Sequence, residues 1–341
     1  MTHPRQVPSR RNVVLISAIG VVVFLGVLAL IGKAAHYDEV LNAFEAADGR
    51  WFPILLGGEV LAFAGYAMAY RGSARTRGGP ELPFFLAARI AAMSNAGAVV
   101  GMGFGGLAVD YWALQRAGET RLGAAARVLA LNTLEWAVLG GAAAAAATAE
   151  LVGAGDGGPT ELQLGWVAAV AAAYVPAALL TSPGRAARIA RWGRRGRVHE
   201  LLATVIAGVV LVREILVRPL HHREAVLGAV FYWGGLLASL WGALRAFGFS
   251  LGVTALVLGF ATGYAASMLP LPIGGVGGID AAMTFSLHFV GVPLATAIAG
   301  VLAYRVFTFW LPLVPAAVAG ATVSGVRSQL PRVQRADTVA G

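Results

Sequence analysis

Long apolar stretches alternate with short charged segments along this chain. Six of the stretches are long enough to cross a bilayer as helices, because about 20 apolar residues span its hydrocarbon core. The alternate-residue pattern of β-strands is absent. The pattern predicts an all-α polytopic membrane protein with a single integral-membrane domain over residues 13–322. The six predicted spans cover residues 13–31, 51–70, 124–147, 162–181, 225–247 and 294–322.

Two further apolar stretches, 82–117 and 251–290, are interrupted at their centres. Proline lacks a backbone N–H and ends a helix, and glycine permits turns and close approach of two backbones. We therefore predict two glycine-broken re-entrant hairpins, the first entering from the inner side of the membrane and the second from the outer side. The residues at the breaks are Gly103, Gly105 and Gly106 in the first hairpin and Pro270, Pro272, Gly274, Gly275, Gly277 and Gly278 in the second.

The basic residues set the predicted orientation, because cytoplasmic loops of membrane proteins are enriched in lysine and arginine. With both broken stretches folded back, all but five of the 26 basic residues lie on the inner side. Both termini, 1–12 and 323–341, are then cytoplasmic, and residues 183–223 form a basic cytoplasmic arm. The expected location is the plasma membrane. The five exceptions are Lys33, Arg50 and Arg245 outside, and Arg89 and Arg305 within the membrane.

A short internal repeat relates two halves of the chain, residues 51–147 and 225–322. Each half has a span, a broken hairpin and a second span, and the charge distribution gives the halves opposite orientations. Transporters built from inverted repeats have this arrangement, and their broken helices meet near the midplane. The alternative is that the glycines only permit tight helix crossings. The matching positions are Gly103, Gly105 and Gly106 in the first half and Gly275, Gly277 and Gly278 in the second.

Several ionisable residues fall within the predicted membrane segments, where a charge costs about 2.5–3.5 kcal/mol on insertion scales. Asp280 follows the second break, and Arg305 lies near the centre of the last span. We predict that these two residues pair. The pair either takes part in substrate binding or only joins two helices. The other candidates for a substrate-binding or translocation site are Glu135, Asn132, Asp110, Glu59 and Arg89, of which Asn132 stands at the repeat position of Arg305.

The amino-acid composition and charge exclude several classes of function. The 341 residues are 58% hydrophobic and 13% charged, with a net charge of +9 and no cysteine. Because the positive charge lies in loops, it indicates attraction to anionic lipid headgroups rather than to nucleic acid. The six histidines lack ligand spacing, and no nucleotide-binding or catalytic motif is present, so we expect no metal, no cofactor and no catalytic residue. Transport would then be passive or driven by an ion gradient or the membrane potential.

The motif of prolines and glycines followed by Asp280, together with Tyr304-Arg305 and Trp310-Leu311-Pro312, resembles the lysylphosphatidylglycerol synthase transmembrane-region family. The likeness covers about residues 50–322. It departs from the family pattern at Asp280, where glutamate is more frequent. The resemblance implies a lipid flippase that moves an anionic or aminoacylated phospholipid, or a polyprenyl-linked lipid, between leaflets.

The resemblance leaves other functions open. One is an intramembrane lipid-modifying enzyme with Asp280 and Glu135 as acid and base, and another is an accessory subunit of a separate synthase. Because no synthase domain follows residue 322, we expect that the chain does not make an aminoacyl lipid by itself. The expected partners are membrane lipids, especially anionic ones. A separate lipid synthase and a homo-oligomer are further candidates.

Overall fold

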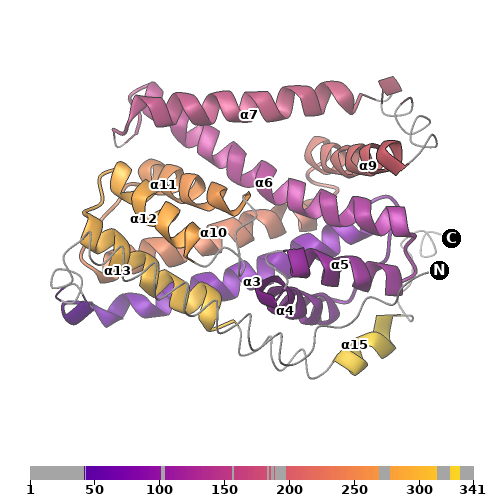
Figure 1. Cartoon of the computed structure of the whole chain (residues 1–341), viewed down its shortest axis with the longest axis horizontal. Helices are drawn as coiled ribbons and strands as arrows, with labels where there is room; N and C mark the ends of the chain where they lie inside the picture. Colours follow the sequence, from indigo (N-terminus) through magenta and orange to yellow (C-terminus); the bar gives the residue numbers. More distant parts are fainter. Residues whose placement is uncertain are drawn as a thin grey trace.

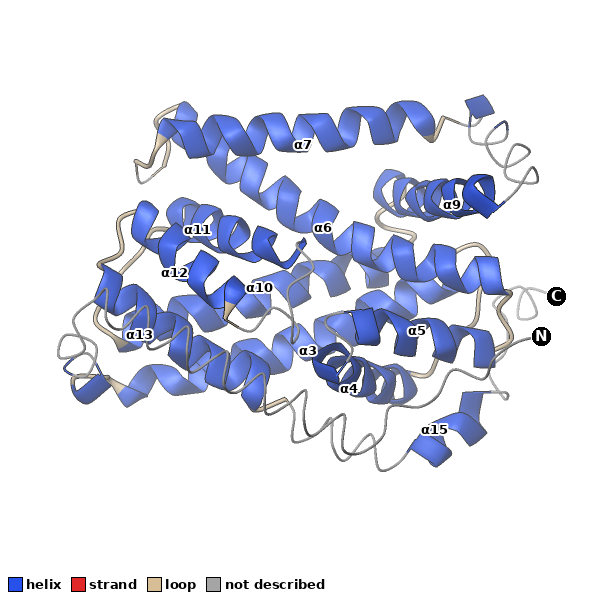
Figure 2. Cartoon of the chain, viewed as in Figure 1, coloured by secondary structure: helices blue, strands red, loops and turns tan. Residues whose placement is uncertain are grey.

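The structure is a computed structural model, and the residues it describes form helices joined by turns and loops (Figures 1 and 2). The described residues are 42, 44–100, 104–155, 157–182, 184–185, 188, 197–268, 277–312 and 323–330. Several predictions therefore lie outside the described residues: the first span at 13–31, and the roles of Gly103, Pro270, Pro272, Gly274 and Gly275.

The helices follow one another without an intervening strand in the described part of the chain. The first half contains η1 (Gly49–Trp51), α3 (Phe52–Arg75), α4 (Phe84–Val100), α5 (Phe104–Arg116), α6 (Arg121–Leu151) and α7 (Thr160–Leu180). The second half contains α9 (Arg197–Val217), α10 (Arg223–Ala246), α11 (Val253–Ala265), η3 (Ala266–Met268), α12 (Gly278–Phe289), α13 (Leu294–Arg305), η5 (Val306–Trp310) and α15 (Val323–Gln329).

Four of the described helices are long and apolar enough to cross a membrane, namely α3 with η1, α6, α7 and α10. They coincide with four of the six predicted spans. The last predicted span begins as α13, but the structure does not continue it as an α-helix. From Val306 to Trp310 the chain forms the π-helix η5, in which the N–H of Leu311 donates to the carbonyl of Val306 at 2.9 Å. The total number of crossings stays a prediction.

The centre of the molecule is the antiparallel pair of α3 and α10 (Figure 1). A Cβ atom built on Gly58 would lie 2.5 Å from the carbonyl oxygen of Gly235, and one built on Gly65 would lie 2.7 Å from that of Gly228. The two backbones are therefore in direct contact, which only glycine permits. The glycines on the contacting faces recur every seven residues, at Gly58, Gly65 and Gly72 on α3 and at Gly228, Gly235 and Gly242 on α10.

Each broken stretch forms a pair of short helices that pack against each other, α4 with α5 and α11 with α12. In the first pair, Ser94 Oγ lies 2.9 Å from the carbonyl oxygen of Gly106. In the second, Ser286 Oγ donates to the carbonyl of Gly259 at 2.6 Å. Small residues at both crossings let a serine reach the partner backbone. Entry of the two pairs from opposite membrane faces stays a prediction.

Helices α7 and α9 both pack against α6 at the periphery of the molecule (Figure 1). Only 6% of the most apolar 18-residue stretch of α7 is buried within the protein, so the rest of the described chain covers little of this helix. Helix α9 lies inside the predicted basic arm, and its residues Leu211, Val212 and Ile215 are buried with Leu131 of α6. The centre of the arm therefore contributes to the protein core.

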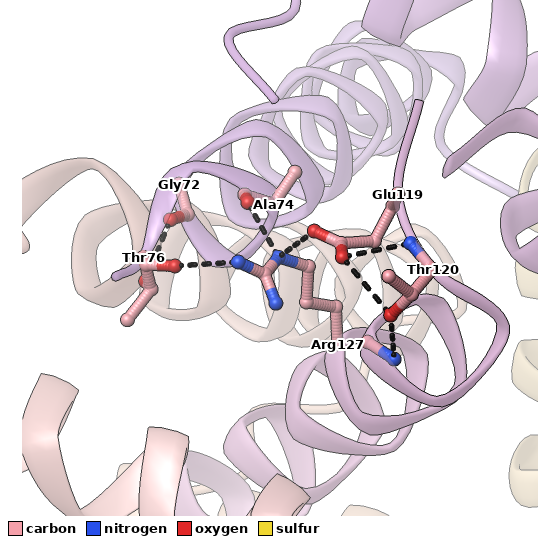
Figure 3. A network of polar contacts seen from close by, with 7 residues as sticks. Gly72, Ala74, Thr76, Glu119, Thr120 and Arg127 are labelled. Atoms are coloured by element: carbon pink, nitrogen blue, oxygen red, sulfur yellow. Dashed lines mark hydrogen bonds and ion pairs between the residues drawn. The ribbon is translucent and has the colours of Figure 1, made fainter. Parts of the chain in front are cut away.

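A network of hydrogen bonds and one ion pair joins the end of α3 to the start of α6 (Figure 3). Arg127 Nε donates to the carbonyl of Ala74 and Arg127 Nη2 to that of Thr76, each at 2.9 Å, and Glu119 Oε2 lies 3.4 Å from Arg127 Nε. Thr120, the N-cap of α6, accepts the N–H of Gly123. A cation at the last carbonyls of a helix satisfies free acceptors and matches the helix dipole.

Replacing Arg127 by alanine is expected to lower the free energy of unfolding by about 3 kcal/mol. The substitution removes the counterion of Glu119 and the donor to the carbonyls of Ala74 and Thr76. Arg127→Lys keeps the charge but not the forked geometry, so an intermediate loss is expected. Thermal unfolding in detergent measures both. Arg121→Ala, an exposed position in the same helix, serves as the control. Equal unfolding midpoints for Arg127→Ala and Arg121→Ala would show that the network does not stabilise the fold.

Candidate functional site

Asp280 is positioned by the first turn of α12. Gly277, the N-cap, has a φ of +85°, a conformation that side-chain-bearing residues rarely adopt. The N–H of Gly277 donates to Asp280 Oδ2 at 2.9 Å. A carboxylate in the first turn also matches the positive end of the helix dipole. The last glycines of the second break thus determine where α12 begins and where Asp280 lies.

Arg305 is the last residue of α13, at the junction with the π-helix η5. Its Nε donates to Asp280 Oδ1, so the predicted pair is formed. The two side chains are only 10% and 5% exposed. The guanidinium also lies over the ring of Phe309, 5.8 Å from its centroid. Its Nη2 is buried and has no hydrogen-bond partner among the described residues, so the pair leaves part of the guanidinium available.

Two glutamates belong to the same region. Glu59 lies on α3 and Glu135 on α6. Glu59 Oε2 and Glu135 Oε1 are both buried without a hydrogen-bond partner among the described residues. Tyr264 of α11 interacts electrostatically with Arg305, Glu135 and Glu59, so the three charged groups lie in the neighbourhood of one hydroxyl. We call Glu59, Glu135, Tyr264, Asp280 and Arg305 the central polar cluster.

Aromatic side chains border the central polar cluster. Trp233 Nε1 donates to the backbone carbonyl of Glu135 at 2.7 Å. The ring centroid of Trp233 lies 4.9 Å from that of Tyr264, and the centroid of Trp136 lies 6.0 Å from it. These rings were not among the site residues predicted from the sequence. The sequence contained one indication of aromatic residues near the site, because Trp136 directly follows the acidic Glu135 in the span predicted at 124–147.

Asp110 lies next to the central polar cluster, but its carboxylate, unlike those of Glu59 and Glu135, has a hydrogen-bond partner at each oxygen. It is completely buried. Its carboxylate accepts hydrogen bonds from the hydroxyl of Tyr66 at 2.6 Å and from that of Ser94 at 2.5 Å. The hydroxyl of Tyr70 donates to the backbone carbonyl of Asp110 at 3.1 Å. Both carboxylate oxygens are thus satisfied, and Asp110 joins α3, α4 and α5.

The remaining candidate residues are not all in one place. Asn132 is half-buried on α6, one turn before Glu135. Arg89 lies on α4 with its guanidinium beside Gly325 of α15. Gly105 packs against Gly97, and the carbonyl oxygen of Gly106 lies 2.9 Å from Ser94 Oγ. The structure thus gathers Glu59, Glu135, Asp280 and Arg305 and places Arg89 beside α15.

The described residues contain no group of three or more His, Asp or Glu side chains that could hold a metal ion. The polar groups of the central cluster are instead single donors and acceptors that come from five helices.

The apolar helices define a multi-pass α-helical membrane protein. The chain belongs to the family described as the lysylphosphatidylglycerol synthase TM region, whose model matches residues 17–316. A comparison with curated proteins finds no match. The family description names the membrane region of a lipid synthase rather than a catalytic domain, and it indicates a function related to membrane lipids.

Proposed function

We propose that the protein moves a lipid between the two leaflets of the plasma membrane. The headgroup would pass through the central polar cluster while the acyl chains stay in the bilayer. The observation that carries this proposal is the buried Nη2 of Arg305, which lacks a partner among the described residues. A buried charged donor without a partner is costly. A lipid phosphate satisfies it, because guanidinium groups form strong hydrogen bonds with phosphate.

The arrangement of the helices supports alternating access. Helices α3 and α10 begin the two proposed halves, and they run antiparallel in contact with each other. Each is followed by a pair of short helices, α4 with α5 and α11 with α12. This is the order of elements that an inverted repeat requires. We propose that the two hairpins enter from opposite faces, with both chain termini in the cytoplasm.

The proposal is tested with purified protein in phosphatidylcholine vesicles that carry an acyl-labelled fluorescent phosphatidylglycerol or phosphatidylethanolamine. A membrane-impermeant reductant quenches the outer leaflet, and the slow phase reports lipid that moves outward. We expect wild-type protein to speed this phase at least about tenfold over protein-free vesicles, which corresponds to about 1.4 kcal/mol of barrier. Arg305→Ala is expected to remove the acceleration.

Arg245→Ala is the matched control, because this arginine lies at the end of α10 over the ring of Trp51 rather than in the central polar cluster. Its rate should equal the wild-type rate. Mass spectrometry of lipids that co-purify with the protein supplies a third probe. The proposal would be contradicted if the protein moved neither phosphatidylglycerol, nor phosphatidylethanolamine, nor the co-purifying lipid. An Arg305→Ala rate equal to the wild-type rate would also contradict it.

A further inference from the structure

The central polar cluster has more acidic groups than basic ones. Arg305 is its one basic side chain among the described residues, and its charge is already balanced by Asp280. Glu59 and Glu135 form no ion pair with any described residue. If both glutamates were ionised, two negative charges would be uncompensated in the interior of the protein.

The groups around the two glutamates do not supply the missing positive charge. Each neighbouring helix presents tyrosines or another acid. Glu135 faces Tyr66 of α3, Asp110 of α5, Tyr232 of α10 and Tyr264 of α11. Glu59 faces Tyr264 of α11 and Tyr304 of α13, and both tyrosines also face Arg305. The aromatic hydroxyls can solvate a neutral acid, but they do not balance a carboxylate.

A buried carboxylate oxygen without a donor is expensive, and such a group normally takes up a proton instead. Glu59 Oε2 and Glu135 Oε1 are both in this position. A positively charged ligand would remove the need for the proton. The rings of Tyr264, Trp136 and Trp233 beside Glu135 provide the faces on which an ammonium group is attracted.

We propose that Glu59 and Glu135 form a proton-exchange site, protonated while the cluster is empty and deprotonated when the ammonium group of a lipid headgroup enters. This inference rests on the proposed function. One ammonium charge replaces one proton, which leaves to the water on the side to which the site is open. Lipid movement in one direction is thereby exchanged for proton movement in the other.

Proton occupancy is measured by infrared spectroscopy of the purified protein at neutral pH, where a protonated carboxyl group gives a carbonyl band separate from that of a carboxylate. Glu59→Gln and Glu135→Gln conserve side-chain shape and should each remove intensity from this band. Glu161→Gln, an exposed position in the first turn of α7, should leave the band unchanged. A spectrum that neither glutamine substitution alters would overturn the proposal.

Coupling is measured in vesicles that contain unlabelled phosphatidylethanolamine, whose outer-leaflet amines are counted with a membrane-impermeant amine reagent. For one-for-one exchange, a gradient of one pH unit should shift the leaflet ratio by up to about tenfold. Reversing the gradient should reverse the shift. Glu135→Gln should abolish the response to the gradient, whereas Glu161→Gln should retain it.

The two proposals fail in different ways. Wild-type movement of phosphatidylethanolamine that ignores the gradient would contradict proton exchange and leave lipid transport intact. Absence of any lipid movement by wild-type protein would contradict the proposed function. The fluorescence assay, with acyl-labelled forms of both lipids, compares phosphatidylethanolamine with the amine-free phosphatidylglycerol under the same gradient. Equal responses would contradict the exchange of a proton for an ammonium group.

Discussion

Replacing Asp280 by alanine is expected to lower the free energy of unfolding by about 3–5 kcal/mol. The reason is that the guanidinium of Arg305, which is 10% exposed, loses its counterion and stays buried. Arg305→Ala leaves the carboxylate of Asp280 without its cation and should also destabilise the protein. The double variant removes both charges together. It should therefore be more stable than the sum of the two single effects implies.

The double variant also separates a structural role from a functional one. If the pair only joins α12 to α13, the double variant should regain transport together with stability. If Arg305 Nη2 binds the headgroup, as we propose, the double variant folds but does not accelerate lipid movement. Unfolding in denaturant and the fluorescence assay, on the same four proteins, give both quantities. Additive stability losses would contradict the pairing, and full transport by the double variant would remove the pair from the mechanism.

The second large effect is expected at the glycine contacts between α3 and α10. Gly65→Ala would place a Cβ atom 2.7 Å from the carbonyl oxygen of Gly228, and Gly58→Ala would place one 2.5 Å from that of Gly235. In both cases the obstacle is backbone, which cannot rotate away. We expect each substitution to force the helices apart and to lower the free energy of unfolding by about 3 kcal/mol, at the upper end for overpacked cores.

Neighbouring glycines provide matched controls for this prediction. A Cβ atom on Gly57 or on Gly234 meets no atom within 4 Å. Gly57→Ala and Gly234→Ala should therefore be neutral or stabilising by up to about 1 kcal/mol, the helix propensity difference between the residues. Thermal unfolding of the four variants compares the contact glycines Gly58 and Gly65 with two glycines that meet no atom, Gly57 next to Gly58 and Gly234 next to the contact glycine Gly235. Similar midpoints for Gly58→Ala and Gly57→Ala would show that the close contact is not required.

The apolar pattern predicted the long helices well, because their length follows from the thickness of a bilayer. Helices α3, α6, α7 and α10 coincide over most of their length with the spans predicted at 51–70, 124–147, 162–181 and 225–247, and each extends a few residues beyond its predicted span. The Asp280–Arg305 pair was predictable for a related reason. Each residue is an isolated charge in an apolar segment, and the two have opposite signs. By contrast, the π-helix after Arg305 could not be predicted, because no residue type in Val306–Trp310 requires that conformation.

The sequence could not distinguish satisfied acids from unsatisfied ones. Asp110 and Glu135 have the same apparent status in the sequence, as acids within apolar segments. The structure separates them, because Tyr66 and Ser94 donate to Asp110, whereas Glu135 Oε1 has no partner among the described residues. Those donors come from other helices, so the difference depends on tertiary packing. Arg89 was grouped with the site for the same reason, and the structure places it beside α15.

One signal in the sequence was missed. Two series of three glycines recur at intervals of seven residues. Gly58 and Gly65 lie in the span predicted at 51–70 and Gly72 just beyond it, and Gly228, Gly235 and Gly242 lie in the span predicted at 225–247. A spacing of seven returns to the same helix face after two turns. This pattern predicts a close crossing of the two helices, which the structure contains. It also strengthens the proposed relation between the halves, because the first helix of each half carries the same pattern.

The central claim is that a lipid headgroup enters the polar cluster between α3, α6, α11, α12 and α13. Cryo-electron microscopy of the protein in a lipid nanodisc, with the lipid that the transport assay selects, tests it most directly. We expect headgroup density beside Nη2 of Arg305, with the acyl chains extending toward the bilayer. Headgroups confined to the outer rim of the helices, with side chains alone filling the space around Arg305, would contradict it.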